Sequence, residues 1–312
     1  MITEAELIVD RRRLKRRVTF WRIAAILLAF VGFMAFAWTL GGLKKYEDHI
    51  ARVRISGLIT GDQATLDLLD AIAASAKVQA VIVRIDSPGG TTAGSEAVYE
   101  ALRKIAKDKP IAAVMDTVAA SGGYITAIAA DHIVARGNTI TGSIGVIFSF
   151  PEISRLLDTL GIKMEEIKSG ELKAEPSPYK PVSDKARAVS NEMVQDSFAW
   201  FTGLVAERRN IPLDQVKILS DGRVYTGRQA AANKLIDEIG GEEKAIAWLE
   251  SEKNIAPGTP VVDWALATNL DPTGLGFAIA NGVLRAMGLE GLAQRAQSSK
   301  LDGMLVLWHP QL

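Results

Sequence analysis

The stretch from Ile111 to Ala130 constrains the fold more than any other part of this sequence. Ile111 to Val118 is an apolar run of strand length, and Ser121-Gly122-Gly123 then leads into a small-residue helix from Tyr124. A turn from a buried strand into a helix lifts a hydroxyl out of the sheet, beside the free N–H groups of the helix start, which stabilise an oxyanion. Ser121 is therefore a candidate nucleophile. The simpler interpretation is a helix cap.

Apolar strands and helices alternate on both sides of this stretch. Buried strands that alternate with helices predict an α/β fold with a parallel sheet and right-handed crossovers. In such sheets ligands bind at the carboxyl ends of the strands, where the turns Gly89-Gly90 and Gly122-Gly123 fall. We expect strands at 49–59, 80–85, 111–118, 132–135 and 163–167, and helices at 61–76, 92–107, 124–130, 152–160, 186–209, 228–234 and 245–249.

The composition excludes several kinds of protein. The 312 residues include no cysteine, which excludes disulfides and thiol catalysis. The three histidines form no metal-ligand motif, and we expect neither a metal nor a cofactor. Basic and acidic residues balance at 36 each, and no basic stripe with interleaved aromatics follows residue 22, so nucleic acid is not an expected partner.

The N-terminal region is expected to anchor the chain in a membrane. Residues 23–43 are uncharged and almost wholly apolar, and Ile23 to Leu40, together with the apolar residues that flank it, can span a bilayer of about 30 Å. Trp21 and Trp38 flank this segment at headgroup depth. The sequence therefore predicts a single transmembrane helix.

Basic residues before this helix predict its orientation. Six of them lie between Arg11 and Arg17, so residues 1–22 should stay in the cytoplasm and the body should be exported. A cleaved signal peptide is the alternative, because Ala35-Phe36-Ala37 matches the pattern of a cleavage site.

A nucleophilic serine needs a base, and this chain offers few. His132 lies beyond the helix that follows Ser121, at the opposite end of the sheet. A lysine can serve instead, in a Ser-Lys dyad. The lysine must be neutral, although its ordinary pKa is about 10.4, so burial by substrate or by a neighbouring subunit has to lower that pKa. The proline-rich loop at 169–182 carries or adjoins Lys168, Lys173 and Lys180.

Five short motifs follow one another in a specific order. They are D-S-P-G-G at Asp86 to Gly90, A-S-G-G-Y at Ala120 to Tyr124, T-G-S-I-G at Thr141 to Gly145, a lysine followed by prolines at Lys173, and G-R-V-Y-T-G-R-Q-A at Gly222 to Ala230. Over roughly residues 50 to 245 this ordered set resembles the signal peptide peptidase A family, peptidase family S49, of membrane-anchored serine proteases.

The resemblance implies a role for each matching residue. Ser121 would be the nucleophile, Lys173 its general base, and Ser143 the hydroxyl that orients the lysine amine. The N–H groups of Gly122 and of the turn Gly89-Gly90 would form the oxyanion hole. Ser143 is equally consistent with a structural turn whose hydroxyl caps the next segment.

Two further features bear on these roles. Glu171 and Glu175 make the surroundings of Lys173 more acidic than the family pattern, which keeps Lys168 and Lys180 open as rival bases. Ser87 is the remaining hydroxyl near a glycine turn. Because Pro88 follows it, we expect Ser87 to form a turn and not to react.

The resemblance also implies an architecture and a function. Residues 44–255 would form a Clp/crotonase-like α/β protease domain on the periplasmic side of a bacterial cytoplasmic membrane, and residues 256–312 a tail that docks on a neighbouring subunit through the apolar segment Leu305 to Trp308. The activity would be endoproteolysis of cleaved signal peptides. The expected partners are signal peptides and other hydrophobic peptides, the lipid bilayer, and further copies of the chain in a ring.

Other functions remain open at this point. A Clp-type peptidase would use histidine and aspartate, but no histidine follows Ser121 at the needed distance. A crotonase-like acyl-CoA enzyme would need a glutamate near the glycine turns. A non-catalytic membrane scaffold that binds hydrophobic peptides is the third alternative.

Overall fold

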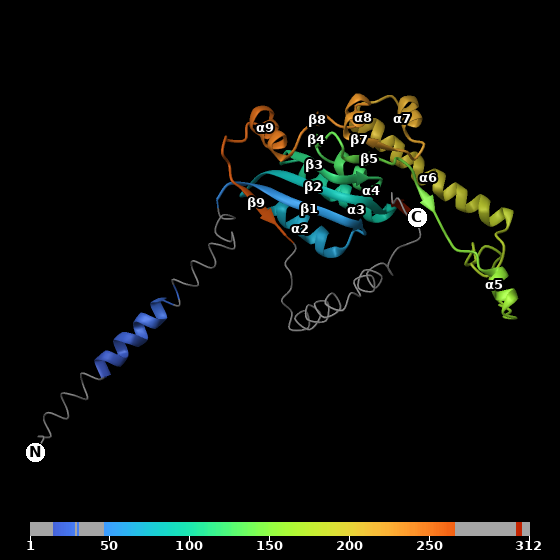
Figure 1. Cartoon of the computed structure of the whole chain (residues 1–312), viewed down its shortest axis with the longest axis horizontal. Helices are drawn as coiled ribbons and strands as arrows, with labels where there is room; N and C mark the ends of the chain where they lie inside the picture. Colours follow the sequence, from blue (N-terminus) through green and yellow to red (C-terminus); the bar gives the residue numbers. More distant parts are fainter. Residues whose placement is uncertain (1–14, 29, 31–46, 266–303, 308–312) are drawn as a thin grey trace, which may run out of the picture.

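A parallel sheet forms the centre of the molecule (Figure 1). The computed structural model describes residues 15–28, 30, 47–265 and 304–307. Six strands run parallel in the order β9-β1-β2-β3-β4-β8. Their bounds are β1 His49–Ile59, β2 Val78–Thr91, β3 Ile111–Ala120, β4 His132–Ala135, β8 Glu238–Ile239 and β9 Val261–Trp264.

Four short strands extend the sheet at its carboxyl edge. β5 (Ile140–Gly142) is parallel to the end of β3, and β7 (Val224–Thr226) is antiparallel to β5. β10 (Met304–Leu307) lies antiparallel both to the end of β2 and to β6 (Ile147–Phe148). The end of β2 therefore gains a partner from a distant part of the chain, β10, and the end of β3 pairs with β5, which follows β4 in the chain.

The strands are buried on both faces because helices cover each face of the sheet. Val81, Val83 and Ile85 of β2 belong to the larger core, with α2 (Gln63–Ala74), α3 (Thr92–Ile105) and α4 (Gly122–Ile128). The alternate residues, Ala80 and Ile82, face the smaller core with α9 (Glu242–Glu252). This alternation explains the continuous apolar sequence of the parallel strands.

An arm extends from the sheet (Figure 1). We use this name for residues 147–194, which include β6, α5 (Ser154–Thr159) and the first part of α6 (Asp184–Arg209). The second part of α6 returns to the body, where Phe201 and Val205 are buried. Two short helices, α7 (Leu213–Leu219) and α8 (Gly227–Ala232), complete this side.

The sequence predicted the parallel α/β sheet, and the structure confirms it. The bounds of β1 and β4 agree with the expected ones. The strand expected at 163–167 was wrong, because that segment pairs with no described strand, and Glu166 within it instead forms ion pairs with Lys168 and Lys180. β2 also continues through the expected turn Asp86 to Gly90, because β1 and β10 both pair with that segment.

The expected membrane helix lies mostly outside the described residues. Residues 15–28 form a helix, so only the first part of the predicted span is described. Among the residues that the structure describes, no helix is both long enough and apolar enough to cross a bilayer.

Close packing at α8 gives a test of the fold. A Cβ at Gly227 would lie 2.0 Å from the carbonyl oxygen of Arg136, so Gly227→Ala must displace backbone. We expect it to lower the free energy of unfolding by about 1–3 kcal/mol. The matched control is Gly203→Ala in α6, where a Cβ meets no atom within 4 Å and should add about 0.5–1 kcal/mol of stability. Thermal denaturation measures both, and equal effects would contradict the packing at α8.

Candidate active site

Ser121 lies at the carboxyl end of β3, directly before α4. Its backbone has φ 55° and ψ −116°, a conformation that L-residues rarely adopt and that costs on the order of 1–3 kcal/mol. Three hydrogen bonds hold it: its N–H donates to Gly142 O at 2.8 Å, and its carbonyl accepts from the N–H groups of Tyr124 and Ile125. The strained turn is thus fixed by the sheet on one side and by the helix on the other.

The hydroxyl of Ser121 is buried and has no partner. The residue is 1% exposed, and its Oγ makes no hydrogen bond to any described residue. A buried hydroxyl without a partner costs on the order of 1–3 kcal/mol. Ser121 is the N-cap residue of α4, but its hydroxyl makes no capping hydrogen bond, so a cap does not account for the side chain. Strain and an unpaired hydroxyl at one residue are typical of a functional site.

Ser143 is held beside Ser121. The paired residues Ala120 and Gly142 end β3 and β5, so Ser121 and Ser143 are the next residue on each strand. Ser143 is buried, also has a positive φ of 50°, and donates its N–H to Arg223 O at 2.8 Å.

The motif Gly222 to Ala230 thereby gains a structural explanation. Its strand β7 pairs with β5, and Tyr225 packs so closely that a Cβ at Gly142 would lie 2.5 Å from its ring. Gly142 also has φ 80°, which favours glycine. The sequence showed this motif only as a sign of family resemblance, whereas here it supports the turn that carries Ser143.

The predicted oxyanion glycines lie on two neighbouring elements. Gly122 is the first residue of α4, so its N–H has no acceptor within the helix. Gly89 and Gly90 lie in β2, the strand next to β3. The N–H of Gly89 already donates to Ser87 Oγ at 3.1 Å, which favours Gly122 as a donor. Gly90 pairs with Ile59 of β1 and with Val306 of β10.

The hydroxyl of Ser87 is engaged in local structure. It also donates to Gly57 O at 2.6 Å, and the residue is fully buried. The role of this hydroxyl is therefore structural, but Ser87 lies in strand β2 and not in the expected turn.

The C-terminal strand β10 covers the edge beside these glycines. Leu307, Val306 and Leu305 pair with Gly89, Gly90 and Thr91, and Leu305 also pairs with Ile147 of β6. The tail segment expected to dock on a neighbour thus pairs with its own chain here, and Trp308 lies outside the described residues. A peptide that uses the same edge must replace β10.

Lys173 and Ser121 belong to different parts of the chain. Lys173 lies in the segment between α5 and α6, and that segment is at the outer end of the arm, away from the sheet whose strand β3 ends before Ser121 (Figure 1). The residue is exposed, and its amine makes no hydrogen bond or ion pair with any described residue. The chain thus brings together Ser121, Ser143 and the glycines, but not the predicted base. The burial that a lysine base needs is not provided within the described chain.

The two rival lysines are ion-paired. Lys168 Nζ lies 2.7 Å from Glu166 and 2.9 Å from Glu175, and these carboxylates, Glu166 first, raise the pKa of Lys168 above its ordinary value. Lys180 Nζ lies 2.5 Å from Glu175. A lysine held as an ammonium ion in this way is poorly suited to accept a proton.

His132 lies at the opposite end of the sheet, as the sequence indicated. It pairs with Ala112 near the start of β3, about 30 Å along the strand from Ser121. Its ring stacks on Trp248 of α9. These positions exclude it as the partner of Ser121 within one chain.

A serine on a strained strand-to-helix turn of a parallel α/β sheet is typical of serine hydrolases. A family model described as Peptidase family S49 matches residues 103–256. A Synechocystis sp. protein named "Putative protease slr0021" is 35% identical over 216 residues, which cover 69% of this chain and 78% of that protein. The chain therefore belongs to peptidase family S49 and is a serine protease.

Two further relatives agree with this family. "Serine protease SPPA, chloroplastic" of Arabidopsis thaliana is 35% identical over 235 residues, covering 70% of this chain and 34% of the relative. "Putative signal peptide peptidase SppA" of Enterococcus faecium is 40% identical over 185 residues, which cover 59% of this chain and 54% of that relative.

Solved structures were also found to be similar. Among them, a ClpP1 mutant from Listeria monocytogenes aligns with 62% of this chain and 94% of its own chain, with a TM-score of 0.43 and 16% identity. The Clp/crotonase assignment of the fold stays a prediction.

The site gives a direct test of Ser121. Ser121→Ala should abolish peptide hydrolysis and labelling by a fluorophosphonate, because it removes the attacking oxygen. It should leave the thermal unfolding midpoint unchanged or slightly higher, since the buried hydroxyl has no partner to lose. Ser87→Ala is the control: it removes a bonded hydroxyl, so it should lower stability and keep labelling. Labelling that persists in Ser121→Ala would contradict the assignment.

Proposed function

We propose that this chain is a membrane-anchored serine endopeptidase that works as an oligomer. Ser121 of one protomer and Lys173 of a neighbouring protomer form its Ser-Lys dyad. Its substrates are apolar peptides, in particular signal peptides left in the membrane after cleavage. The observation that carries the proposal is the separation of a strained, unpaired Ser121 from an exposed, unpaired Lys173 within one chain.

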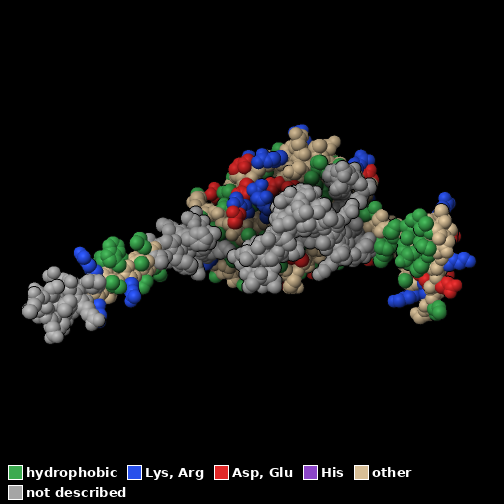
Figure 2. Space-filling view, turned by 60° about the horizontal axis from the view of Figure 1, so that its bottom comes forward, with side chains coloured by type: hydrophobic (Ala, Val, Ile, Leu, Met, Phe, Trp, Pro, Cys, Tyr) green, Lys and Arg blue, Asp and Glu red, His purple; other side chains and the backbone are tan. Residues whose placement is uncertain are grey.

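The surface of the arm supports assembly with further copies. Apolar side chains gather at the end of the molecule where α5 lies (Figure 2). Exposed apolar patches of this kind mark interaction sites in soluble domains. The exposed apolar residues of the arm are Ile147, Ile153, Leu156, Leu160, Ile162, Met164, Ile167, Leu172, Tyr179, Val189 and Met193.

The long helix α6 fits a role in this contact. Val189 and Met193 of this helix are 46% and 42% exposed, because this part of α6 projects from the body. A neighbour that covers the arm would bury them. The same neighbour would enclose the loop of Lys173 and remove water from it, as a lysine base requires.

A groove at the base of the arm supports the preference for apolar peptides. It has a volume of about 270 Å³ and lies between the segment 146–150 and the start of α6. Val146, Ile147 and Phe148 give it apolar walls.

The chemistry follows from these groups. Lys173 of the neighbour takes the proton of Ser121 Oγ while that oxygen attacks the peptide carbonyl. The N–H groups of Gly122 and Gly90 stabilise the oxyanion that forms. Lys173 then protonates the leaving amine, and water releases the acyl group by the same steps. Ser143, adjacent to Ser121, orients the lysine amine when the arm of the neighbour is in place.

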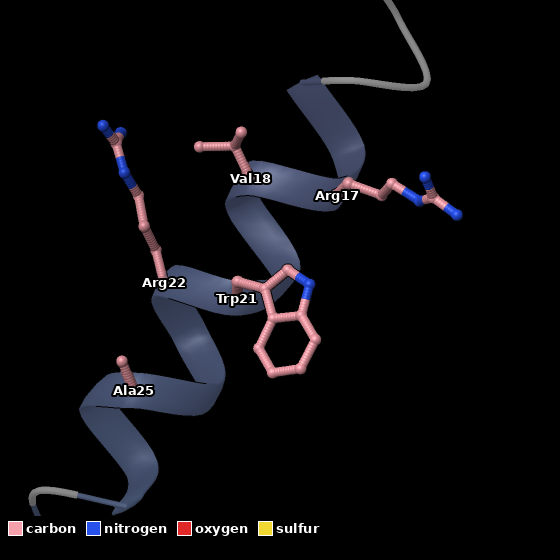
Figure 3. A pocket seen from close by; sticks show the side chains of 5 residues that line it. All are labelled: Arg17, Val18, Trp21, Arg22 and Ala25. Atoms are coloured by element: carbon pink, nitrogen blue, oxygen red, sulfur yellow. The ribbon is translucent and has the colours of Figure 1, made fainter.

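The N-terminal helix supports the membrane anchor. A pocket on the surface of this helix is lined by Arg17, Val18, Trp21, Arg22 and Ala25 (Figure 3). Trp21 is 69% exposed, and an indole beside arginines suits the headgroup layer, with the apolar residues that follow in the bilayer. The body would then lie on the exported side of a bacterial cytoplasmic membrane.

Mixed oligomers test the shared dyad. Ser121→Ala and Lys173→Ala homo-oligomers should each be inactive, and the double mutant should be no worse than either. Unfolding and refolding the two single mutants together should restore about a quarter of the wild-type activity, because random mixing places an intact serine beside an intact lysine at about a quarter of the interfaces. Refolded wild type is the control. Mixtures that stay inactive while wild type recovers would assign each dyad to one protomer.

Fractionation tests the anchor independently. The full chain should sediment with membranes and require detergent for release, because residues 23–43 are apolar. A chain that begins at residue 47 should remain in the supernatant and keep hydrolysis of soluble peptides. If the full chain also stays in the supernatant, the anchor is wrong and the protease assignment is unaffected.

A further inference from the structure

Four charged side chains form a cluster in the segment that carries Lys173. Glu175 is the centre: its side chain is 5% exposed and lies 2.9 Å from Lys168 Nζ and 2.5 Å from Lys180 Nζ. Glu166 also contacts Lys168, at 2.7 Å, and Lys180, at 3.7 Å. The cluster is thus two carboxylates and two ammonium groups, with no net charge.

The cluster also fixes the backbone on either side. Glu175 accepts a hydrogen bond from Ser177 N–H, and Glu166 one from Ser177 Oγ. Ser177 is 1% exposed, and the next residue, Pro178, accepts from Ile153 N–H at 2.8 Å, which joins the segment to the start of α5. The loop from residue 166 to residue 180 is therefore braced through Glu175.

Lys173 lies within this brace and takes no part in it. The turn that presents it is closed by hydrogen bonds from Lys173 N–H to Gly170 O and from Glu175 N–H to Leu172 O. Glu175 is only two residues further along the chain. Its position therefore determines where Lys173 is held at the end of the arm.

An acidic residue so close to a lysine base raises a chemical problem. A carboxylate stabilises the ammonium form of a nearby lysine, whereas the base must be neutral. Here the carboxylate of Glu175 is already occupied, since Lys180 and Lys168, in that order, lower its pKa to about 2. The two rival lysines thus neutralise Glu175 and leave Lys173 without a carboxylate partner.

We infer that Glu175 is a positioning residue for Lys173, and that Lys168 and Lys180 act as its fixed countercharges. This inference rests on the proposed function, in which Lys173 is the general base. It also accounts for the acidic surroundings that set this chain apart from the family pattern.

A further ion pair joins this loop to α6. Lys185 Nζ of α6 lies 2.6 Å from Glu171, and both side chains are largely exposed. Glu171 lies two residues before Lys173, as Glu175 lies two residues after it. Glu171→Gln is therefore a matched control: it is the same substitution at the same sequence distance, but in water and outside the cluster.

The experiment compares pH–activity profiles of the full-length enzyme in detergent. Glu175→Gln should lower kcat about tenfold with little change in KM, because the base is misplaced. It also leaves the cluster with one excess positive charge, which favours a neutral Lys173 and moves the alkaline-rising inflection to lower pH by about 0.3–1 unit. Lys168→Gln leaves one excess negative charge and should move the inflection by a similar amount to higher pH.

Glu171→Gln should keep kcat within about twofold and the inflection within about 0.2 unit, since exposed charges are screened. If the charged cluster served folding alone, Glu175→Gln and Lys168→Gln would not move the inflection of the pH–activity profile in opposite directions. If Glu175→Gln keeps the wild-type kcat and pH profile while Lys173→Ala is inactive, only the positioning role of Glu175 is overturned. An active Lys173→Ala would instead overturn the proposed base, and this inference with it.

Discussion

The hydrogen bond from Ser121 N–H to Gly142 O is the interaction on which the rest of the site depends. It ties the strained residue at the end of β3 to the end of β5, where the next residue is Ser143. β7 supports β5 from the other side, and α4 begins directly after Ser121. The strain at Ser121 is thus balanced by the pairing of three strands and the start of one helix. A strained residue persists only when its surroundings fix it in this way.

The second constraint is the separation, within one chain, between the sheet edge that carries Ser121 and the arm that carries Lys173. The sheet fixes Ser121, Ser143 and the glycine turns at one edge, while the arm holds Lys173 away from that edge. An arm with many exposed apolar side chains is costly for an isolated chain, and a neighbouring copy would bury them. Assembly would then complete the site and confine proteolysis to the oligomer. In the proposed mechanism, this is why the general base can lie on a segment that contributes little to the core of its own chain.

Much of the sheet could be predicted from the sequence, because each parallel strand is buried on both faces and reads as a continuous apolar run. The turn at Ser121 was also predictable from the strand, the glycines and the small-residue helix that follow one another. The continuation of β2 to Thr91 was not, because it depends on pairing with β10 from the other end of the chain. The exposure of Val189 and Met193 was not predictable either, since an apolar helical face does not tell whether its partner is the same chain.

The ion cluster around Glu175 could not be predicted from the sequence for a similar reason. A segment with alternating charges from Glu166 to Lys180 does not specify which of them pair. The sequence showed only that the surroundings of Lys173 are more acidic than the family pattern. That observation suggested Lys168 and Lys180 as rival bases, whereas in the structure they pair with Glu175.

Cross-linking tests the shared dyad most directly, because the natural chain has no cysteine to interfere. A full-length variant with Ser121→Cys and Lys173→Cys would be treated with a short bismaleimide in detergent and separated under denaturing conditions. The account predicts a ladder of covalent dimers and higher oligomers, with neither single variant giving the ladder. A product that stays monomeric and carries both cysteines joined within one chain would contradict it.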